Sequence, residues 1–172
     1  MSLIPLRISG IPSSIGFVSP GVTRVNADRT VGLTELLAHV LSSNSSVSSL
    51  IVGPDPARYP IPASRRFKDV RRMLSSLPGR RPSLVVVDSP PPDFDFEELR
   101  FLVMQQTAIV IGGDDLVVGN AEFEYRWVKD ERVLMAGGQA FSLRLTGRGL
   151  EGSVYHPVTE PVKTRFDMLD DD

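Results

Sequence analysis

Apolar and polar positions alternate with a helical period in three stretches of the chain. In residues 32–43, GLTELLAHVLSS, apolar side chains recur every three or four positions, which is typical of an amphipathic helix. The same spacing predicts a second helix over 65–77, with Ser64 as its N-cap. A third helix is predicted over 96–106, where acidic residues occupy the first turn.

Other apolar stretches have the pattern of strands. The first thirty residues mix short apolar pieces with Gly, Pro and Ser, which predicts one or two irregular strands. Continuous apolar runs, which predict buried strands, occupy 50–53 (LIVG), 83–88 (SLVVVD) and 107–113 (TAIVIGG). From residue 122 onward the pattern changes to strict alternation in EFEYRWV and QAFSLRLTG, which indicates antiparallel strands joined by turns.

These elements define an α+β fold, with a mixed or antiparallel sheet, about three helices and a C-terminal antiparallel meander. Residues 1–162 are expected to form a single globular domain, and residues 163–172 an acidic, flexible tail. No apolar run approaches the roughly 18 residues of a membrane-spanning helix, and the N-terminus is a poor signal peptide, so we expect an intracellular protein.

The composition removes several kinds of chemistry. The 172 residues include no cysteine, which excludes disulfides, thiol catalysis and cysteine metal sites. The two histidines, His39 and His156, stand far apart and lack the spacing of metal ligands or of a catalytic triad. We therefore expect no cofactor, no small-molecule substrate and no enzymatic activity.

Charge is segregated along the chain although the net charge is only −2. A basic surface facing an anionic partner is predicted on the helix at 65–77 and its flanks, because several phosphates could be neutralised there. The residues assigned to it are Arg58, Arg65, Arg66, Lys68, Arg71, Arg72, Arg80 and Arg81. The sequence leaves open whether that partner is RNA in a nucleoprotein or an anionic membrane surface.

Separated charges also suit self-association, so a homo-oligomer is expected. The proline-rich stretch at 54–64, PDPARYPIPAS, predicts an extended, exposed loop whose rigidity favours docking. The residues assigned to self-association are Pro54, Pro56, Tyr59, Pro60, Pro62, Asp114 and Asp115.

The stretch AIVIGGDDLVVGN, residues 108–120, resembles the metal-holding hairpin of RNA-dependent RNA polymerases. Asp88 and Asp93 add a second aspartate pair, and two metal ions bridged by these carboxylates would be the required chemistry. Only 20 residues separate Asp93 from Asp114, however, which leaves no room for the intervening polymerase elements. An acidic turn between buried strands is the preferred interpretation, and a carboxylate metalloenzyme ranks last.

Residues 83–113, SLVVVDSPPPDFDFEELRFLVMQQTAIVIGG, resemble the ParA/MinD-type ATPases, in which a strand ending in Asp and a proline pair precedes a helix and another buried strand. The phosphate-binding pattern G-x-x-x-x-G-K-[ST] is absent, because none of the three lysines follows a glycine. The resemblance therefore implies at most an inactive relative of a nucleotide-binding domain.

Glu122 to Val158, EFEYRWVKDERVLMAGGQAFSLRLTGRGLEGSVYHPV, resembles the C-terminal strands of rhabdovirus matrix proteins, and IGFVSP with LTELLAHVL is similar to their first strand and helix. The resemblance implies a self-assembling structural protein of the virion and host cytoplasm that bridges nucleocapsid and membrane. The alternative is a degenerate nucleotide-binding-like α/β domain that acts as a binding or regulatory module. A parallel sheet formed by LIVG, LVVV and AIVI would favour the alternative.

Overall fold

Residues 2–79, 81–114 and 123–157 are described by the computed structural model. The strands are β1 (Ser2–Pro5), β2 (Gly16–Ser19), β3 (Gly21–Ala27), β4 (Ser49–Val52), β5 (Arg66–Phe67), β6 (Leu84–Asp88), β7 (Ala108–Gly113), β8 (Phe123–Val128), β9 (Glu131–Ala136), β10 (Gln139–Thr146) and β11 (Gly149–Val154). The α-helices are α1 (Leu33–Ser43), α2 (Val70–Ser75) and α3 (Arg100–Met104), and the 3-10 helices are η1 (Pro56–Arg58), η2 (Ala63–Arg65) and η3 (Phe96–Leu99).

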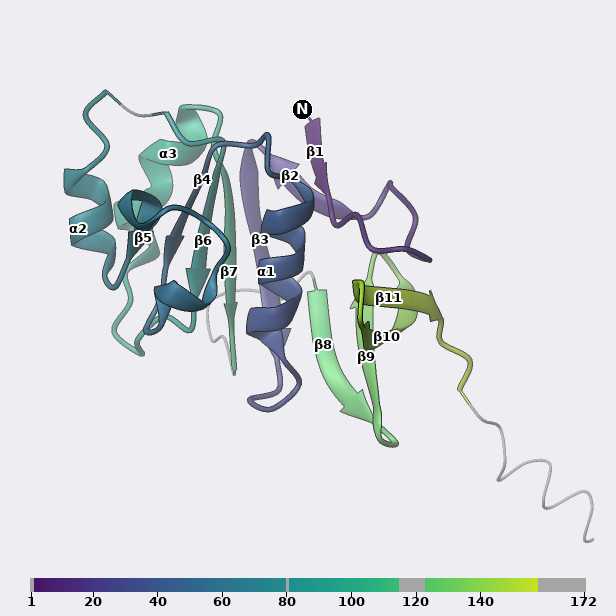
Figure 1. Ribbon diagram of the computed structural model, residues 1–172. Coiled ribbons are helices and arrows are strands. Elements are labelled where there is room, and N and C mark those ends of the chain that lie inside the picture. The colour runs from purple at the N-terminus through teal and green to yellow at the C-terminus, as the bar shows by residue number, and fades with distance from the viewer. Residues whose placement is uncertain (1, 80, 115–122, 158–172) are drawn as a thin grey trace, which may run out of the picture.

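A nine-stranded sheet organises these elements in the order β11-β10-β9-β8-β3-β7-β6-β4-β5 (Figure 1). From β5 to β8 every neighbouring pair is parallel, whereas β8, β9, β10 and β11 pair antiparallel. The three apolar runs predicted as buried strands are β4, β6 and β7, which lie side by side. The expected mixed sheet, three helices and C-terminal meander are therefore confirmed, and the runs LIVG, LVVV and AIVI are parallel.

Continuous apolar sequence suits the parallel strands because both faces of the sheet are covered there. Along β6, Leu84 and Val86 enter one core, and Val85 and Val87 enter the core on the opposite face. All four side chains are at most 1% exposed. Burial on both sides explains why this strand shows no polar alternation.

Helix α1 covers one face of the sheet through its buried Leu36, Leu37, Val40 and Leu41 (Figure 1). The opposite face is covered by α2 and by η3 with α3, whose Met73, Leu99 and Leu102 belong to the second core. The parallel half is thus a three-layer arrangement, in which the strands form the middle layer.

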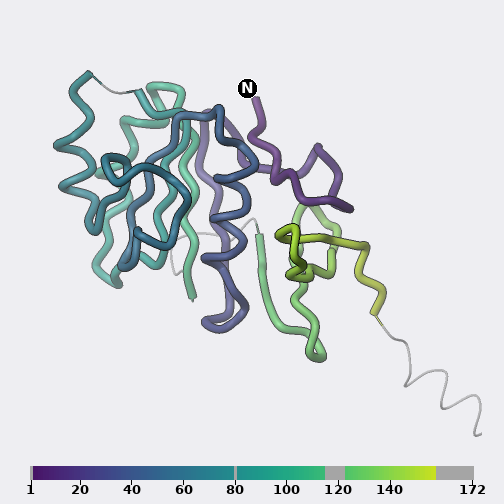
Figure 2. Tube along the Cα trace, in the orientation of Figure 1, coloured from purple at the N-terminus to yellow at the C-terminus, as the bar shows by residue number. Residues whose placement is uncertain are grey.

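The N-terminal segment lies against the far edge of the antiparallel half. Strands β1 and β2 form a separate two-stranded antiparallel sheet. The loop between them runs beside β11 (Figure 2). There Ser9 forms a bridge with Glu151 of β11, and the Ser9 carbonyl accepts a hydrogen bond from the Gly152 N–H at 2.7 Å. At Gly10, with φ +89°, any Cβ would collide with the Gly152 carbonyl, so glycine is required at this close approach.

The predicted basic helix over 65–77 is wrong. Arg65 ends η2, Arg66 lies in strand β5, and the helix begins only at Val70. Asp69, rather than Ser64, is its N-cap, because the Asp69 carboxylate accepts the Arg72 N–H at 2.8 Å. Pairing of Arg66 and Phe67 with β4 prevents the preceding residues from joining the helix.

The acidic turn predicted within residues 108–120 lies only partly in the described residues. Strand β7 ends at Gly113, and β7 and β8 both pair parallel with β3, on its two sides. β7 and β8 are therefore not partners in a hairpin, and the second apolar run of the predicted turn, at 116–120, lies outside the described residues. Asp115 lies outside the described residues.

Candidate functional site

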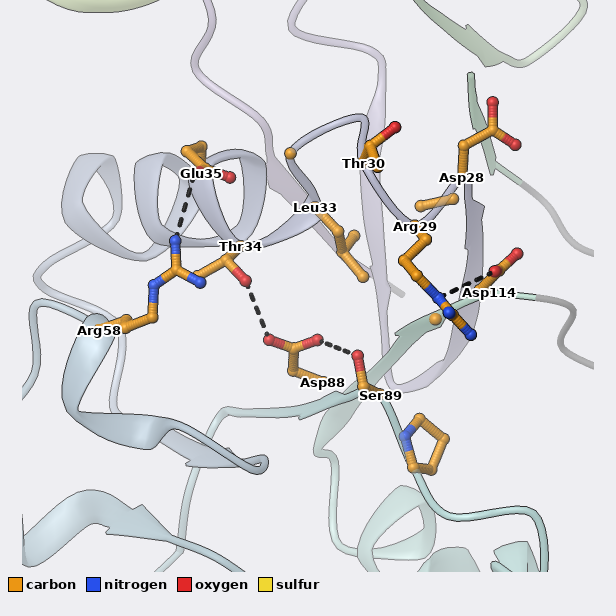
Figure 3. A pocket seen from close by; sticks show the side chains of 14 residues that line it. Asp28, Arg29, Thr30, Leu33, Thr34, Glu35, Arg58, Asp88, Ser89 and Asp114 are labelled. Atoms are coloured by element: carbon orange, nitrogen blue, oxygen red, sulfur yellow. Dashed lines mark hydrogen bonds and ion pairs between the residues drawn. The ribbon is translucent and has the colours of Figure 1, made fainter. Parts of the chain in front are cut away.

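A cleft of about 420 Å³ opens at the carboxyl ends of β3, β6 and β7, next to the start of α1 (Figure 3). Ligands of parallel α/β sheets bind at this end of the strands. Its lining residues are Ala27, Asp28, Arg29, Thr30, Gly32, Leu33, Thr34, Glu35, Arg58, Asp88, Ser89, Pro90, Gly113 and Asp114. The cleft is the first candidate for a functional site.

The loop between β3 and α1 has the position and length of a phosphate-binding P-loop. Residues 27–34, ADRTVGLT, run from the last residue of β3 into the first turn of α1, and they can be compared with the pattern G-x-x-x-x-G-K-[ST]. Gly32 and Thr34 match the pattern, and Gly32 has the left-handed φ of 98° that favours glycine. Ala27 and Leu33 depart from it, at the first glycine and at the lysine.

Of the two departures from the pattern, Leu33 in place of the lysine has the larger effect on what the cleft can bind. In P-loop proteins the lysine at this position reaches the β- and γ-phosphates of the nucleotide. Here the side chain is apolar and packs against Gly112 of β7. The approach is so close that a Cβ added to Gly112 would lie 3.0 Å from Leu33 Cδ2. The loop therefore provides no ammonium group for a triphosphate.

Asp88 lies at the end of β6, where the residue is 7% exposed and its carboxylate is held by hydroxyl groups. Thr34 Oγ1 donates to Asp88 Oδ2 at 3.3 Å, and Ser89 Oγ donates to Oδ1 at 2.8 Å. The Tyr59 hydroxyl donates to Oδ2 as well. A threonine and an aspartate at these two positions hold Mg²⁺ in P-loop NTPases, whereas this aspartate is already bonded to three hydroxyl donors of the chain.

Tyr59 reaches this carboxylate from the proline-rich loop. The side chain is 3% exposed, and burial raises the pKa of its hydroxyl far above the usual value, with a further rise from the Asp88 charge. The phenol therefore remains protonated and able to donate. The expected exposed loop is found at Pro54, Pro60 and Pro62, whereas Pro56 is half-buried and Tyr59 is not on the surface.

The charges around the cleft are mostly acidic. Arg58 pairs with Glu35 at 3.3 Å, and Arg29 Nε lies 3.9 Å from an Asp114 carboxylate oxygen (Figure 3). Asp28 and Asp88 add two further carboxylates. Two guanidinium groups face four carboxylates, an environment that repels a polyphosphate.

The C-terminal meander fixes the conformation of the loop at 28–32. The Asp28 carboxylate accepts the Trp127 N–H at 3.1 Å, and the Trp127 indole N–H donates to Thr30 Oγ1 at 3.1 Å. Arg132 Nε donates to the Val31 carbonyl at 2.9 Å and its guanidinium stacks 4.6 Å from the centre of the Trp127 ring. None of these contacts could be read from the sequence, because about 100 residues separate the partners.

The predicted anionic-partner residues are dispersed over several elements. Arg58 lies at the cleft, Arg65 donates to Ser48 Oγ, and Arg66 donates to the Ala57 carbonyl. Arg72 pairs with Asp69 at 3.5 Å. The remaining described members, which are exposed, are Lys68, Arg71 and Arg81, and Arg80 lies outside the described residues. Binding of RNA or an anionic membrane by these residues stays a prediction, as does the homo-oligomer.

The aspartates considered as metal ligands do not converge in the part of the chain that the structure describes. There, no group of three or more His, Cys, Asp or Glu side chains could hold a metal ion. Asp93 is exposed on the connection after β6, and Asp114 contacts Arg29. His39 connects α1 to the Arg7 carbonyl and to the Leu150 N–H, and is not among the residues that line the cleft.

Fold and cleft define a class: an α/β domain with helices on both faces of a largely parallel sheet and a cleft at the carboxyl ends of its strands. Neither a protein-family model nor a curated protein matches the sequence. Among solved structures, the chain is similar to a KaiC-like protein from the hyperthermophilic archaeon Pyrococcus horikoshii, with a TM-score of 0.62 and 11% identity. The match covers 90% of this chain and 99% of that one.

This similarity overturns the rhabdovirus matrix resemblance. The strands β8 to β11, which lie in the segment that carried the resemblance, continue a parallel sheet whose fold is similar to that of an archaeal KaiC-like protein. A viral matrix function, with its virion and host-cytoplasm location, has no support. In the described part of the chain, no helix is long and apolar enough to cross a membrane.

Proposed function

We propose that this chain is a degenerate nucleotide-binding-type α/β domain that acts as a binding or regulatory module. The parallel sheet and the similarity to a KaiC-like protein support the first half of the proposal. The changed phosphate loop supports the second half, because a domain that retains the architecture without the phosphate contacts can still present surfaces to partners.

The observation that carries this proposal is the environment of Leu33 and Asp88. A magnesium–triphosphate needs a lysine at the first position and an accessible aspartate at the second. Leu33 is packed against Gly112, and the Asp88 carboxylate accepts hydrogen bonds from Thr34, Tyr59 and Ser89. The residues present therefore do not fit a magnesium–nucleotide.

Calorimetric titration with ATP and GTP in the presence of Mg²⁺ tests the proposal. The wild-type chain is expected to bind either nucleotide more weakly than about 1 mM and to show no hydrolysis. The double variant Ala27→Gly/Leu33→Lys restores the consensus and should bind measurably tighter. Ala27→Gly/Leu33→Met is the matched control, since it repeats the loop change without the charge.

Two results would contradict the proposal. One is hydrolysis of ATP by the wild-type chain that is lost in Asp88→Asn. The other is wild-type nucleotide binding as tight as that of the lysine variant, because the missing ammonium group would then be irrelevant.

A further inference from the structure

A second cleft lies at the carboxyl ends of β4 and β6. Its volume is about 660 Å³, within the range of about 300–1,000 Å³ that ligand sites occupy. Val52 and Val87, which are 4% and 1% exposed, belong to its lining, together with the half-buried Val70 and Phe94. An apolar floor is thus present at the end of the sheet where ligands bind.

The two sides of this second cleft carry opposite charges. The segment from β5 to α2 contributes Lys68 and Arg71, and the connection from β6 to α3 contributes Asp93 and Glu98. All four side chains are exposed. Among the described residues, none of these four side chains forms a hydrogen bond or an ion pair, so the two sides do not neutralise each other.

The three other charged residues that line this cleft, Asp69, Asp88 and Asp95, are already engaged in the fold. The Asp88 carboxylate accepts hydrogen bonds from Thr34, Tyr59 and Ser89. The Asp69 carboxylate caps α2 and pairs with Arg72, and the Asp95 carboxylate caps η3 by accepting the Glu97 N–H at 3.0 Å. They hold the two sides in place, and so leave the four exposed charges for a ligand. Prolines at 54, 90 and 91 stiffen the rim, which lowers the ordering cost of binding.

We propose that this second cleft binds an extended peptide segment of a partner protein, in which one acidic and one basic side chain flank an apolar side chain. The acidic group would pair with Lys68 and Arg71, the basic group with Asp93 and Glu98, and the apolar group would cover Val52 and Val87. In an extended chain, every second side chain points the same way, so the motif is acid-x-apolar-x-base or its reverse. The acidic side of the cleft disfavours phosphate ligands.

The inference rests on the proposed binding-module function and supplies its partner class. Its test is independent of nucleotides: a failure to bind peptides would leave the nucleotide titrations unaffected, and nucleotide hydrolysis would leave peptide binding open to measurement. The two failures are therefore distinguishable.

The experiment uses fluorescently labelled, terminally blocked peptides in a polarisation titration. The probes are Ser-Asp-Ala-Leu-Ala-Arg-Ser and its reverse, Ser-Arg-Ala-Leu-Ala-Asp-Ser, with Asn and Gln replacing the charged residues in a neutral version. One of the two charged orders is expected to bind about tenfold tighter than the other and than the neutral peptide, since two exposed ion pairs each contribute modestly.

Reversing the charges of the cleft provides the decisive comparison. The double variant Lys68→Glu/Arg71→Glu should weaken binding of the preferred peptide about tenfold, and adding Asp93→Lys/Glu98→Lys should transfer the preference to the reversed peptide. Arg81→Glu/Lys129→Glu is the matched control, because it makes the same charge change at exposed residues outside the cleft.

Two outcomes would overturn the inference. The first is that neither charged peptide binds better than the neutral one. The second is that the cleft variants and the control variant change the affinity equally, which would reduce the effect to net charge. Thermal melts of each variant confirm that it is folded before its affinity is compared.

Discussion

The two halves of the nine-stranded sheet differ in what their strands bury. In the parallel half, β7 has all six residues buried, and its side chains enter the cores on both faces. In the antiparallel half, β10 buries Phe141, Ser142 and Leu143 and then exposes its last three residues. The difference follows from the helices, which cover both faces of the first half and not of the second.

The two halves also contribute differently to the candidate sites. Both clefts open at the carboxyl ends of parallel strands, because these ends meet at one edge of the sheet. The antiparallel half contributes no lining residue to either cleft but holds the loop at 28–32 through Trp127 and Arg132. One half forms the sites, and the other supports the conformation of one of them.

The largest expected difference between the halves is in stability. Ile109→Ala in β7 removes a side chain that is 0% exposed and should lower the free energy of unfolding by about 2–5 kcal/mol. Leu145→Ala in β10 removes a side chain that is 51% exposed, and should change it by no more than about 0.5 kcal/mol. Urea denaturation measures both, and equal losses would contradict the contrast drawn between the halves.

The pH dependence of stability should separate two buried tyrosines. Burial raises the pKa of Tyr125, in the antiparallel half, to about 12 from the usual 10.0. The charge of Arg132 lowers this pKa by a smaller amount, and the charge of Glu35 raises it. The unfolded chain therefore loses this proton first, so the contribution of Tyr125 is complete below pH 10 and is lost between pH 10 and about 12. The loss amounts to about 2–3 kcal/mol.

Tyr59, which contacts the parallel half, has a still higher pKa, so its contribution declines over a wider range above pH 10. Denaturation at pH 9 and pH 11 of the wild type, Tyr125→Phe and Tyr59→Phe measures the effect. Each variant should lose less stability between these pH values than the wild type does. An unchanged pH dependence in either variant would show that the phenol concerned ionises normally in the folded protein.

The smallest effect concerns the support of the loop. Trp127→Ala removes the indole hydrogen bond to Thr30 and the stacking of Arg132, and should cost about 1 kcal/mol. Amide hydrogen exchange of residues 28–32 should become faster. Met135→Ala, at a side chain of similar exposure in the neighbouring strand β9, is the control and should leave the exchange unchanged.

Much of the fold was predictable because period and run length are local properties. The continuous runs gave β4, β6 and β7, and the helical spacing gave α1, with its four buried apolar residues in the predicted positions. The second helix was overestimated, since the competing cap at Asp69 and the pairing of Arg66 with Ile51 depend on folding and on a distant strand.

The candidate site was only partly predictable. The sequence pattern requires a lysine after the second glycine, so the segment ADRTVGLT was not recognised, although Gly32 and Thr34 keep the spacing between a strand and a helix. Tyr59 was assigned to an exposed loop because its neighbours are prolines. Its burial against Asp88 depends on where the loop returns to the sheet.

The sequence by itself determined the buried strands β4, β6 and β7 and the helix α1. It also excluded cysteine chemistry and showed that the lysine of a phosphate loop is missing. The tertiary structure decided that the apolar runs are parallel, that Thr34, Tyr59 and Ser89 meet on Asp88, and that opposite charges line a second cleft. The physical reason is range. The periodicity of apolar residues is a property of about a dozen consecutive positions. Strand order and the convergence of side chains depend on contacts between residues that are far apart in the chain.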